Sequence, residues 1–355
     1  MDYTPSNTRA LPRVAKIDAA TLEAEYVGRG IPVVLTDMIG DWPAMQRWRD
    51  LAYLREVAGD VQVPVRGNRY NFRLFGTVGL AAYLDWLEGR VNVELLDAVL
   101  HTAPYISHNR GMTPRLREDT DFSRFVAEGY QVGQPAFWIG PPKAETPLHY
   151  DSVGIVYFAQ IVGRKRAILF PADQSDKLYE SDYFDFTTCY SKIDLRDVDY
   201  DRFPRFADAV PYMTVLEPGE VLVFPRRLWH EFRTLDISVS VTAHAGTADD
   251  YSHRRNPMLL RERARQALHW FGVHARGRCS CHSNPSDSEW QACMGAVSNA
   301  MSVPPWINRV PPLRYLAHRI SLSMLHGHSL GEILDWREPD PREPDWREAA
   351  GEVAR

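Results

Sequence analysis

The chain has 355 residues, of which 45% are hydrophobic and 11% aromatic, so it is long and apolar enough to bury a sizeable core. Its formal net charge of −5 provides no general basic field, which argues against nucleic acid as a partner. Because the sequence contains no apolar run of about 18 residues and no signal peptide after Met1, we expect a cytoplasmic protein without a membrane span.

Residues 1–98 carry short helical and strand patterns that we expect to brace a larger core. The segment 1–15 is predicted to be a flexible leader. The apolar spacing predicts helices over 19–26, 48–58 and 79–88, and strands over 32–36 and 61–65. Amphipathic helices of this kind pack on the outside of a β core.

Residues 99–250 are strand-like and are expected to form the catalytic core. Runs rich in β-forming residues predict strands over 137–139, 155–161, 167–170, 213–216, 221–224 and 237–242. A long polar and aromatic excursion lies between Pro171 and Tyr212. Because loops of this length inside a compact domain are usually functional or ordered against the body, we expect it to pack there or to cover a substrate groove.

The pattern becomes helical over 251–335. Helices are predicted over 258–271, 288–301 and 312–325, and the last two are apolar enough to need a partner surface. The charged, proline-rich stretch 336–355 predicts an extended tail. Cys279, Cys281 and Cys293 form either a zinc site or free thiols, and the Cys-x-Cys spacing favours free thiols.

Two segments supply the ligand set of a mononuclear metal site. In a strand, residues two apart point to one face, so His149 and Asp151 can offer a nitrogen and an oxygen to one ion. His230 follows a Pro-Gly turn and the apolar strand-like run from Val221, and an antiparallel pairing would bring it alongside. Two imidazoles and one carboxylate hold non-haem Fe(II) and leave positions open for chemistry. A His-x-Asp pair alone is more often two solvated or core side chains.

Four stretches extend this pattern, namely Phe137 to Asp151, Tyr157 to Pro171, Asp201 to His230 and, upstream, Gly30 to Trp48. Together they resemble the cupin-type JmjC family of Fe(II)- and 2-oxoglutarate-dependent oxygenases over roughly residues 20–245, most of all the branch containing the asparaginyl hydroxylase of hypoxia-inducible factor. The resemblance implies a mainly β fold with α elements: a double-stranded β-helix (cupin or jelly-roll) core, bracing N-terminal helices and a C-terminal helical region. That last region is expected to form a homodimer interface or a cap.

The resemblance also implies the cofactors and the residues that hold them. Fe(II) is expected on His149, Asp151 and His230, with O2 and 2-oxoglutarate as cosubstrates. The distal carboxylate of 2-oxoglutarate is expected on Lys165, with help from Thr146, Tyr105 and Thr242. Thr242 stands where the asparaginyl hydroxylase branch carries an amide.

The lysine is supported by chemistry as well as by resemblance. A dicarboxylate that chelates iron at one end needs a cation for the other end inside a narrow barrel. Only five of the 41 basic residues are lysines, so a lysine on an apolar strand is not a matter of composition. The alternative is that Lys165 belongs to a basic surface turn, Gly163 to Arg166.

The favoured function is hydroxylation of an asparaginyl, histidinyl, aspartyl or arginyl side chain in a protein or peptide, with release of succinate and CO2. The alternatives are a small-molecule or free amino-acid hydroxylase, demethylation of methylated lysine by the same chemistry, and a non-catalytic cupin binding module. Tyr150, Trp138 and His244 are candidate substrate residues, although each is equally compatible with a packing role.

Overall fold

The structure is a computed structural model that describes residues 3–66, 74–90, 105–108, 112–152, 154–181, 188–250 and 255–270. The chain divides into two compact units, one made of 1–181 and 189–256, the other of 182–188 and 257–355. In the second unit the described part is Thr188 and helix α7 (Pro257–Trp270), which confirms the first of the predicted C-terminal helices. The helices expected over 288–301 and 312–325, the tail, the dimer interface and the three C-terminal cysteines lie outside the described residues.

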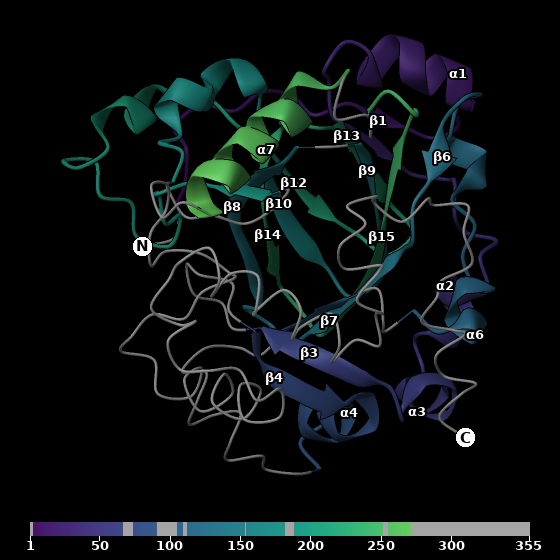
Figure 1. The fold of residues 1–355 in the computed structure, drawn as a ribbon. Helices are drawn as coiled ribbons and strands as arrows, with labels where there is room; N and C mark the ends of the chain where they lie inside the picture. Colours follow the sequence, from purple (N-terminus) through teal and green to yellow (C-terminus); the bar gives the residue numbers. More distant parts are fainter. Residues whose placement is uncertain are drawn as a thin grey trace. The chain divides into compact units, whose positions relative to one another are not determined.

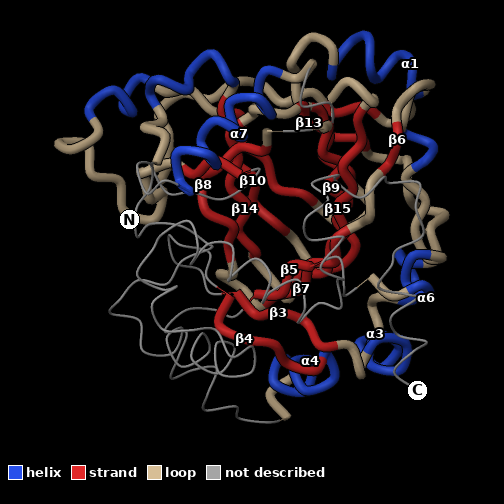
Figure 2. Tube along the Cα trace, in the orientation of Figure 1, coloured by secondary structure: helices blue, strands red, loops and turns tan. Residues whose placement is uncertain are grey.

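Two β-sheets form the core of the first unit, as Figures 1 and 2 show. The five-stranded sheet has the order β11 (Thr188–Tyr190), β8 (Glu145–Asp151), β14 (Trp229–Thr234), β10 (Lys165–Phe170) and β12 (Tyr212–Leu216). The ten-stranded sheet has the order β1 (Arg13–Val14), β2 (Val33–Leu35), β13 (Val221–Pro225), β9 (Ile155–Val162), β15 (Ser238–Gly246), β7 (Ala136–Gly140), β5 (Tyr105–His108), β3 (Gln62–Arg66) and β4 (Leu74–Gly79), with β6 (Gln131–Val132) paired to β15.

The inner faces of the sheets pack on one another. Alternate residues of β9 divide between two cores: Phe158 joins the cluster between the sheets, whereas Tyr157 joins the cluster beneath the helices. Phe158 stacks on Phe232 of the opposite sheet with ring centroids 4.3 Å apart. The predicted mainly β, cupin-type double-stranded core is confirmed, with two facing sheets that do not close into one continuous barrel.

The N-terminal helices cover the outer face of the large sheet. They are α1 (Ala19–Leu22) continued by the π-helical turn η1 (Glu23–Val27), α2 (Ala44–Arg47), α3 (Leu51–Ala58), α4 (Leu80–Leu87) and α6 (Pro114–Arg117). The three predicted N-terminal helices are confirmed with small shifts. The helix expected from residue 48 begins at Leu51, because the side chain of Asp50 accepts from the Ala52 N–H and caps it there.

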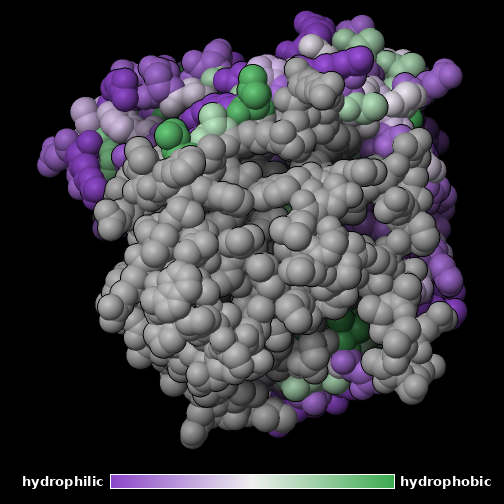
Figure 3. Space-filling view, in the orientation of Figure 1, coloured by the Kyte–Doolittle hydropathy of each residue, from purple (hydrophilic) through white to green (hydrophobic). Residues whose placement is uncertain are grey.

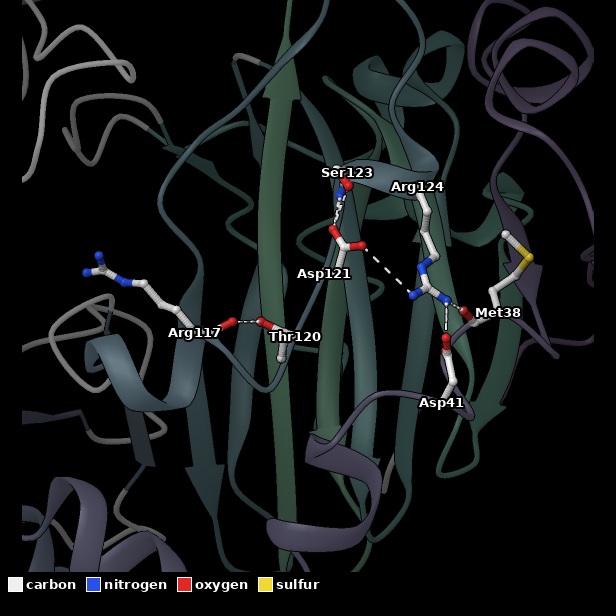
Figure 4. A network of polar contacts seen from close by, with 7 residues as sticks. All are labelled: Met38, Asp41, Arg117, Thr120, Asp121, Ser123 and Arg124. Carbon is white, nitrogen blue, oxygen red and sulfur yellow. Dashed lines mark hydrogen bonds and ion pairs between the residues drawn. The ribbon is translucent and has the colours of Figure 1, made fainter.

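A buried carboxylate and a surface network fasten these helices to the rest of the unit. Asp119 is fully buried and accepts from Trp48 Nε1 at 2.9 Å and Tyr53 Oη at 2.6 Å. Nearby, Arg124 donates to the Met38 carbonyl at 3.0 Å and to Asp41 at 2.8 Å (Figure 4). The segment 119–124 is therefore tied both to the loop that precedes α2 and to Trp48 and helix α3, which follow it.

The predicted flexible leader is wrong over the described residues from Tyr3. Tyr3 is buried, its N–H donates to the Leu195 carbonyl at 2.8 Å, and its ring lies 5.1 Å from that of Phe206. Further along, Arg13 and Val14 form β1, parallel to β2. The leader is ordered because its few apolar residues find partners that are distant in the sequence, which a local pattern cannot reveal.

The excursion between β10 and β12 is ordered against the body where it is described. It contains two 3₁₀ helices, η4 (Ala172–Lys177) and η5 (Pro204–Asp208), as well as strand β11. The side chain of Gln174 ties its two ends together, donating to the Val210 carbonyl at 3.0 Å and accepting from the Val210 N–H at 2.8 Å. Residues 182–187 lie outside the described part, and a role in covering a substrate stays a prediction.

The surface of the described residues is mostly hydrophilic on the side shown in Figure 3, with a few apolar side chains among them. Among the described residues, no helix has the length and apolar character needed to cross a bilayer.

Candidate metal centre and cosubstrate pocket

The three predicted metal ligands come together between the sheets. His149 and Asp151 share one face of β8, and His230 of β14 is the direct register partner of His149. The imidazole centroids lie 4.0 Å apart, and His230 Nε2 lies 3.9 Å from Asp151 Oδ2. One ligand atom from each of the three residues lies within 4.8 Å of the others. This spacing suits a single ion held on one side.

Each imidazole is oriented by the carbonyl two residues before it in the chain. His149 Nδ1 lies 2.7 Å from the Pro147 carbonyl, and His230 Nδ1 lies 2.9 Å from the Leu228 carbonyl. A carbonyl can only accept, so Nδ1 carries the proton and Nε2 keeps its lone pair for a metal. Burial, reinforced by the neighbouring His149, lowers the pKa of His230 to about 3, so this ring is neutral at physiological pH. The residues fit Fe(II), whose usual facial ligand set they reproduce.

The turn that delivers His230 is held against the strand that carries the other ligands. Arg227 has a φ of 66°, a left-handed conformation that is uncommon for a residue with a side chain. Its N–H donates to the carbonyl of Asp151 at 2.9 Å. This bond fixes the position of the β13–β14 turn relative to the end of β8.

Thr146 reaches the same face as the ligands because of an irregularity in β8. Strict alternation would place Thr146, three residues before His149, on the opposite face. The pairing of β8 with β14 shifts register, so that His230 opposes His149 but Phe232 opposes Thr146. Thr146 therefore lies on the inner face with Phe232, as a β-bulge allows.

Lys165 lies inside the protein and not in a surface turn. It is 0% exposed, and its Nζ donates to Tyr105 Oη at 2.8 Å and to Ser240 Oγ at 3.0 Å. The ammonium also lies 4.8 Å from the ring centre of Phe158. Burial lowers the pKa of Lys165 to about 7. Within the described part of the chain no carboxylate pairs with this lysine, so an anion bound from outside can serve as its counter-ion.

The remaining predicted cofactor residue lies beside one of the predicted substrate residues. Trp138 Nε1 donates to Thr242 Oγ1 at 2.8 Å, and the Trp138 ring lies 5.5 Å from that of Tyr105. The structure thus brings Thr146, Lys165, Tyr105, Thr242 and Trp138 to the space between the sheets.

Two residues of the pocket, Ser240 and Phe158, were not predicted from the sequence. Ser240 could have been predicted, because alternation from Thr242 on the same strand places Ser240 on the same face. Phe158 gave no signal beyond its place in an apolar strand.

The other two candidate substrate residues differ in their placement. His244 is half-buried on β15, on the same face as Thr242, with Val156 as its register partner. Tyr150 lies on the opposite face of β8 from the ligands and packs edge-on against Trp229 with centroids 4.6 Å apart. Tyr150 is therefore a packing residue and is not brought to the site.

Comparison with known proteins gives a consistent family. The Cupin-like domain family matches residues 19–244. The chain is 30% identical over 246 residues to lysine-specific demethylase JMJ30 of Arabidopsis thaliana, which covers 67% of this chain and 56% of that protein. It is 31% identical to lysine-specific demethylase 8 of Xenopus tropicalis (66% and 52% covered) and 33% identical to human HSPB1-associated protein 1 (41% and 30%). The chain spans about half the length of the first of these relatives. The finer resemblance to the asparaginyl hydroxylase branch stays a prediction.

Proposed function

The chain belongs to the cupin-like JmjC family, whose oxygenases use Fe(II), 2-oxoglutarate and O2, and we propose that it hydroxylates an amino-acid side chain in a protein or peptide. The observation that carries the proposal is the cluster of His149, Asp151 and His230, with both Nε2 atoms left free by their Nδ1 contacts. In this proposal these three residues hold the iron.

The protein's own part in the reaction is to bind, orient and exclude water. When bound, iron and 2-oxoglutarate supply the oxidising chemistry, in which O2 and 2-oxoglutarate become succinate and CO2 as a C–H bond becomes C–OH. In this proposal Lys165 is the anchor that pairs with the distal carboxylate of 2-oxoglutarate. The hydroxyls of Tyr105 and Ser240 hold its ammonium in place. Thr146 and the Thr242–Trp138 pair line the same space.

The substrate is proposed to approach along the metal-facing side, where Trp138 and His244 lie. The relatives named above as lysine-specific demethylases favour removal of a lysine methyl group as a second candidate, since hydroxylation of an N-methyl group leads to loss of formaldehyde. A small-molecule substrate remains the alternative at the same site. A non-catalytic binding module would have no chemical reason to keep the three ligands and a buried lysine that has no carboxylate partner among the described residues.

The proposal is tested by succinate formation. Protein loaded with Fe(II) without oxygen is given 2-oxoglutarate and O2, alone and then with peptide fractions of a cell extract, and the peptides are searched by mass spectrometry for one added oxygen or one lost methyl group. Succinate that rises with a fraction supports the oxygenase, and the mass change separates hydroxylation from demethylation. Iron-loaded protein that forms no succinate with any fraction or with free amino acids contradicts the proposal.

A further inference from the structure

Of two neighbouring arginines in the turn before His230, only one has a carboxylate partner among the described residues. Arg226 and Arg227 are neighbours in the turn between β13 and β14 and are both exposed. Arg226 forms an ion pair with Asp250, which also accepts from the Thr247 N–H at 2.8 Å. Arg227 has no carboxylate partner among the described residues, although it is the closer of the two to His230 in the chain.

Arg227 is held next to the metal site by its backbone. Its left-handed φ of 66° and its N–H bond to the carbonyl of Asp151 fix its Cα at the end of β8, where the ligands lie. Neither the metal, the cosubstrate anchor nor the packing of the core uses its side chain. A long cationic side chain is therefore fixed at its base, at the end of the strand that carries His149 and Asp151, and it forms no ion pair among the described residues.

The other groups near this end do not offset that charge. Asp151 is the proposed metal ligand. Asp250 forms an ion pair with Arg226, and Asp249 forms one with Arg255 at 2.7 Å. Glu180 accepts from Tyr150 Oη at 3.4 Å, on the outer side of β8. His244 adds a half-buried imidazole on the inner face, close enough to His230 to influence it electrostatically. Nitrogen donors without a fixed acceptor thus outnumber available carboxylates among the described residues here.

We infer that Arg227, with His244, selects a substrate that carries a carboxylate close to the C–H bond that reacts. The inference rests on the proposed function and deepens it by naming the substrate class. A guanidinium recognises a carboxylate with two parallel hydrogen bonds, which sets orientation as well as charge. A methylated lysine has the opposite requirement, because its cation needs an aromatic cage or acidic groups, and an arginine at the end of β8 without a carboxylate partner among the described residues repels it. The favoured substrate is an acidic peptide segment and not a basic one.

The test measures binding and does not need turnover. Full-length protein is loaded with Zn(II) and 2-oxoglutarate, and fluorescein-labelled peptides of one length are titrated by fluorescence anisotropy at 25 and 250 mM salt. One peptide carries Asp and Glu around a central Asn, one is neutral, one carries Lys, and one carries trimethyl-lysine. We expect the acidic peptide to bind at least about tenfold more tightly than the others at low salt, with a preference that shrinks at high salt.

Substitutions at Arg227 must respect its backbone. Asn and Asp tolerate the left-handed conformation better than other non-glycine residues, so Arg227→Asn and Arg227→Asp change the charge from +1 to 0 and −1 with little added strain. The preference for the acidic peptide should be lost in Arg227→Asn, reversed in Arg227→Asp and largely kept in Arg227→Lys. Arg49→Asn is the matched control, because Arg49 is also exposed but lies between α2 and α3.

The outcomes separate this inference from the proposed function. Equal binding of all four peptides by the wild-type protein, or an equal loss in Arg49→Asn, overturns the inference even if succinate is formed. Acid-selective binding that depends on Arg227 in a protein that never forms succinate upholds the recognition and contradicts the oxygenase. Displacement of the acidic peptide by free aspartate or glutamate at equal concentration would assign the same carboxylate site to a free amino acid.

Discussion

The two faces of the strands β8, β14 and β10 bury charge in opposite ways. On the outer face, Glu145 lies 3.3 Å from Arg196 and Glu231 lies 3.0 Å from Arg166, so each buried carboxylate has a counter-ion. On the inner face, Lys165 is fully buried and donates to two neutral hydroxyls, those of Tyr105 and Ser240. Because an unpaired buried charge is costly, the outer pairs serve stability, whereas Lys165 has no carboxylate partner in the described part of the chain, which supports its proposed role as the anchor of a cosubstrate carboxylate.

The same contrast separates Tyr150 from its two neighbours. His149 and Asp151 point to the inner face and offer lone pairs to a metal, whereas Tyr150 points outward and packs on Trp229. Side chains that are adjacent in the sequence therefore have unrelated tasks. Substitutions on the inner face should affect chemistry, and substitutions on the outer face should affect stability.

The largest effect is expected from the metal ligands. His149→Ala and Asp151→Ala should reduce succinate formation to background, because two ligands cannot hold the iron on one face. The fold should persist, since removing a ligand relieves a crowded cluster of polar atoms. The measurement is succinate together with bound iron and circular dichroism. Tyr150→Phe is the control from the outer face, and activity near wild type in His149→Ala would refute the metal site.

Lys165 should control the cosubstrate and not the metal. Lys165→Met keeps the length of the side chain and removes the charge, so we expect about 100-fold more 2-oxoglutarate to be needed for half-maximal turnover, corresponding to about 2.7 kcal/mol. Iron binding should be unchanged. Arg164→Met is the matched control, because Arg164 precedes Lys165 but forms an exposed pair with Asp236 at 2.8 Å. An unchanged requirement in Lys165→Met would remove the anchor from the proposal.

Breaking an outer ion pair should cost stability and leave chemistry intact. Arg166→Met removes the ion-pair partner of the buried Glu231, and the expected loss is about 3 kcal/mol in the free energy of unfolding, the low end for a broken buried pair because Arg196 and Arg233 still act on Glu231 electrostatically. The double variant Arg166→Met/Glu231→Gln should be less destabilised than the single variant, since it leaves no unpaired charge. Urea unfolding measures both. A single variant as stable as wild type would mean that the outer pair contributes little, and the contrast between the faces would fail.

The pH dependence of stability should carry opposite signs on the two faces. Burial lowers the pKa of Lys165 from 10.5 to about 7, so between these values the unfolded chain binds a proton that the folded chain lacks, and stability rises with pH. Burial raises the pKa of Glu145 from 4.5 to about 7, so between these values the folded chain holds the extra proton, and stability falls as pH rises.

The two windows can be separated by substitution and by ligand. In urea titrations from pH 5 to 10, Glu145→Gln should flatten the acid limb and Lys165→Met the alkaline limb. Zn(II) with 2-oxoglutarate should also flatten the alkaline limb, because a carboxylate beside Lys165 restores its proton. An alkaline limb unaffected by Lys165→Met would show that another group produces it.

Local patterns were sufficient to predict many of the strands and to place His149 and Asp151 on one face, because these depend on alternation along one segment, whereas Lys165 was predicted mainly from the resemblance. His230 was harder in principle, since its register with His149 is a long-range property, but the turn before Val221 and the resemblance supplied it. Thr146 shows the limit most clearly. Alternation alone places it on the wrong face, and the register shift that corrects this arises from pairing between two strands.

The N-terminal leader and the outer ion pairs were missed for a related reason. Tyr3 is ordered by Leu195 and Phe206, and Glu145 is paired with Arg196 from a distant loop. The sequence on either side of Tyr3 or Glu145 does not predict these partners. Contacts of this kind depend on how the excursion folds back over the small sheet, and local periodicity does not encode it.

The smallest effect is expected at Thr242, which takes part in a hydrogen bond between two neutral groups on the inner face. Thr242→Val keeps the shape of the side chain and removes the acceptor for Trp138 Nε1, leaving a half-buried donor without this partner at a cost of about 1 kcal/mol. Because Trp138 packs on Tyr105, which in turn binds Lys165, a loosened indole should raise the 2-oxoglutarate requirement by about three- to tenfold without changing iron binding. Thr242→Ser restores the acceptor and should restore the requirement, measured from succinate formed at stepped 2-oxoglutarate concentrations. If Thr242→Val and Thr242→Ser are equally impaired, the methyl group and not the hydrogen bond is what the pocket needs, and Thr242 acts there only by packing.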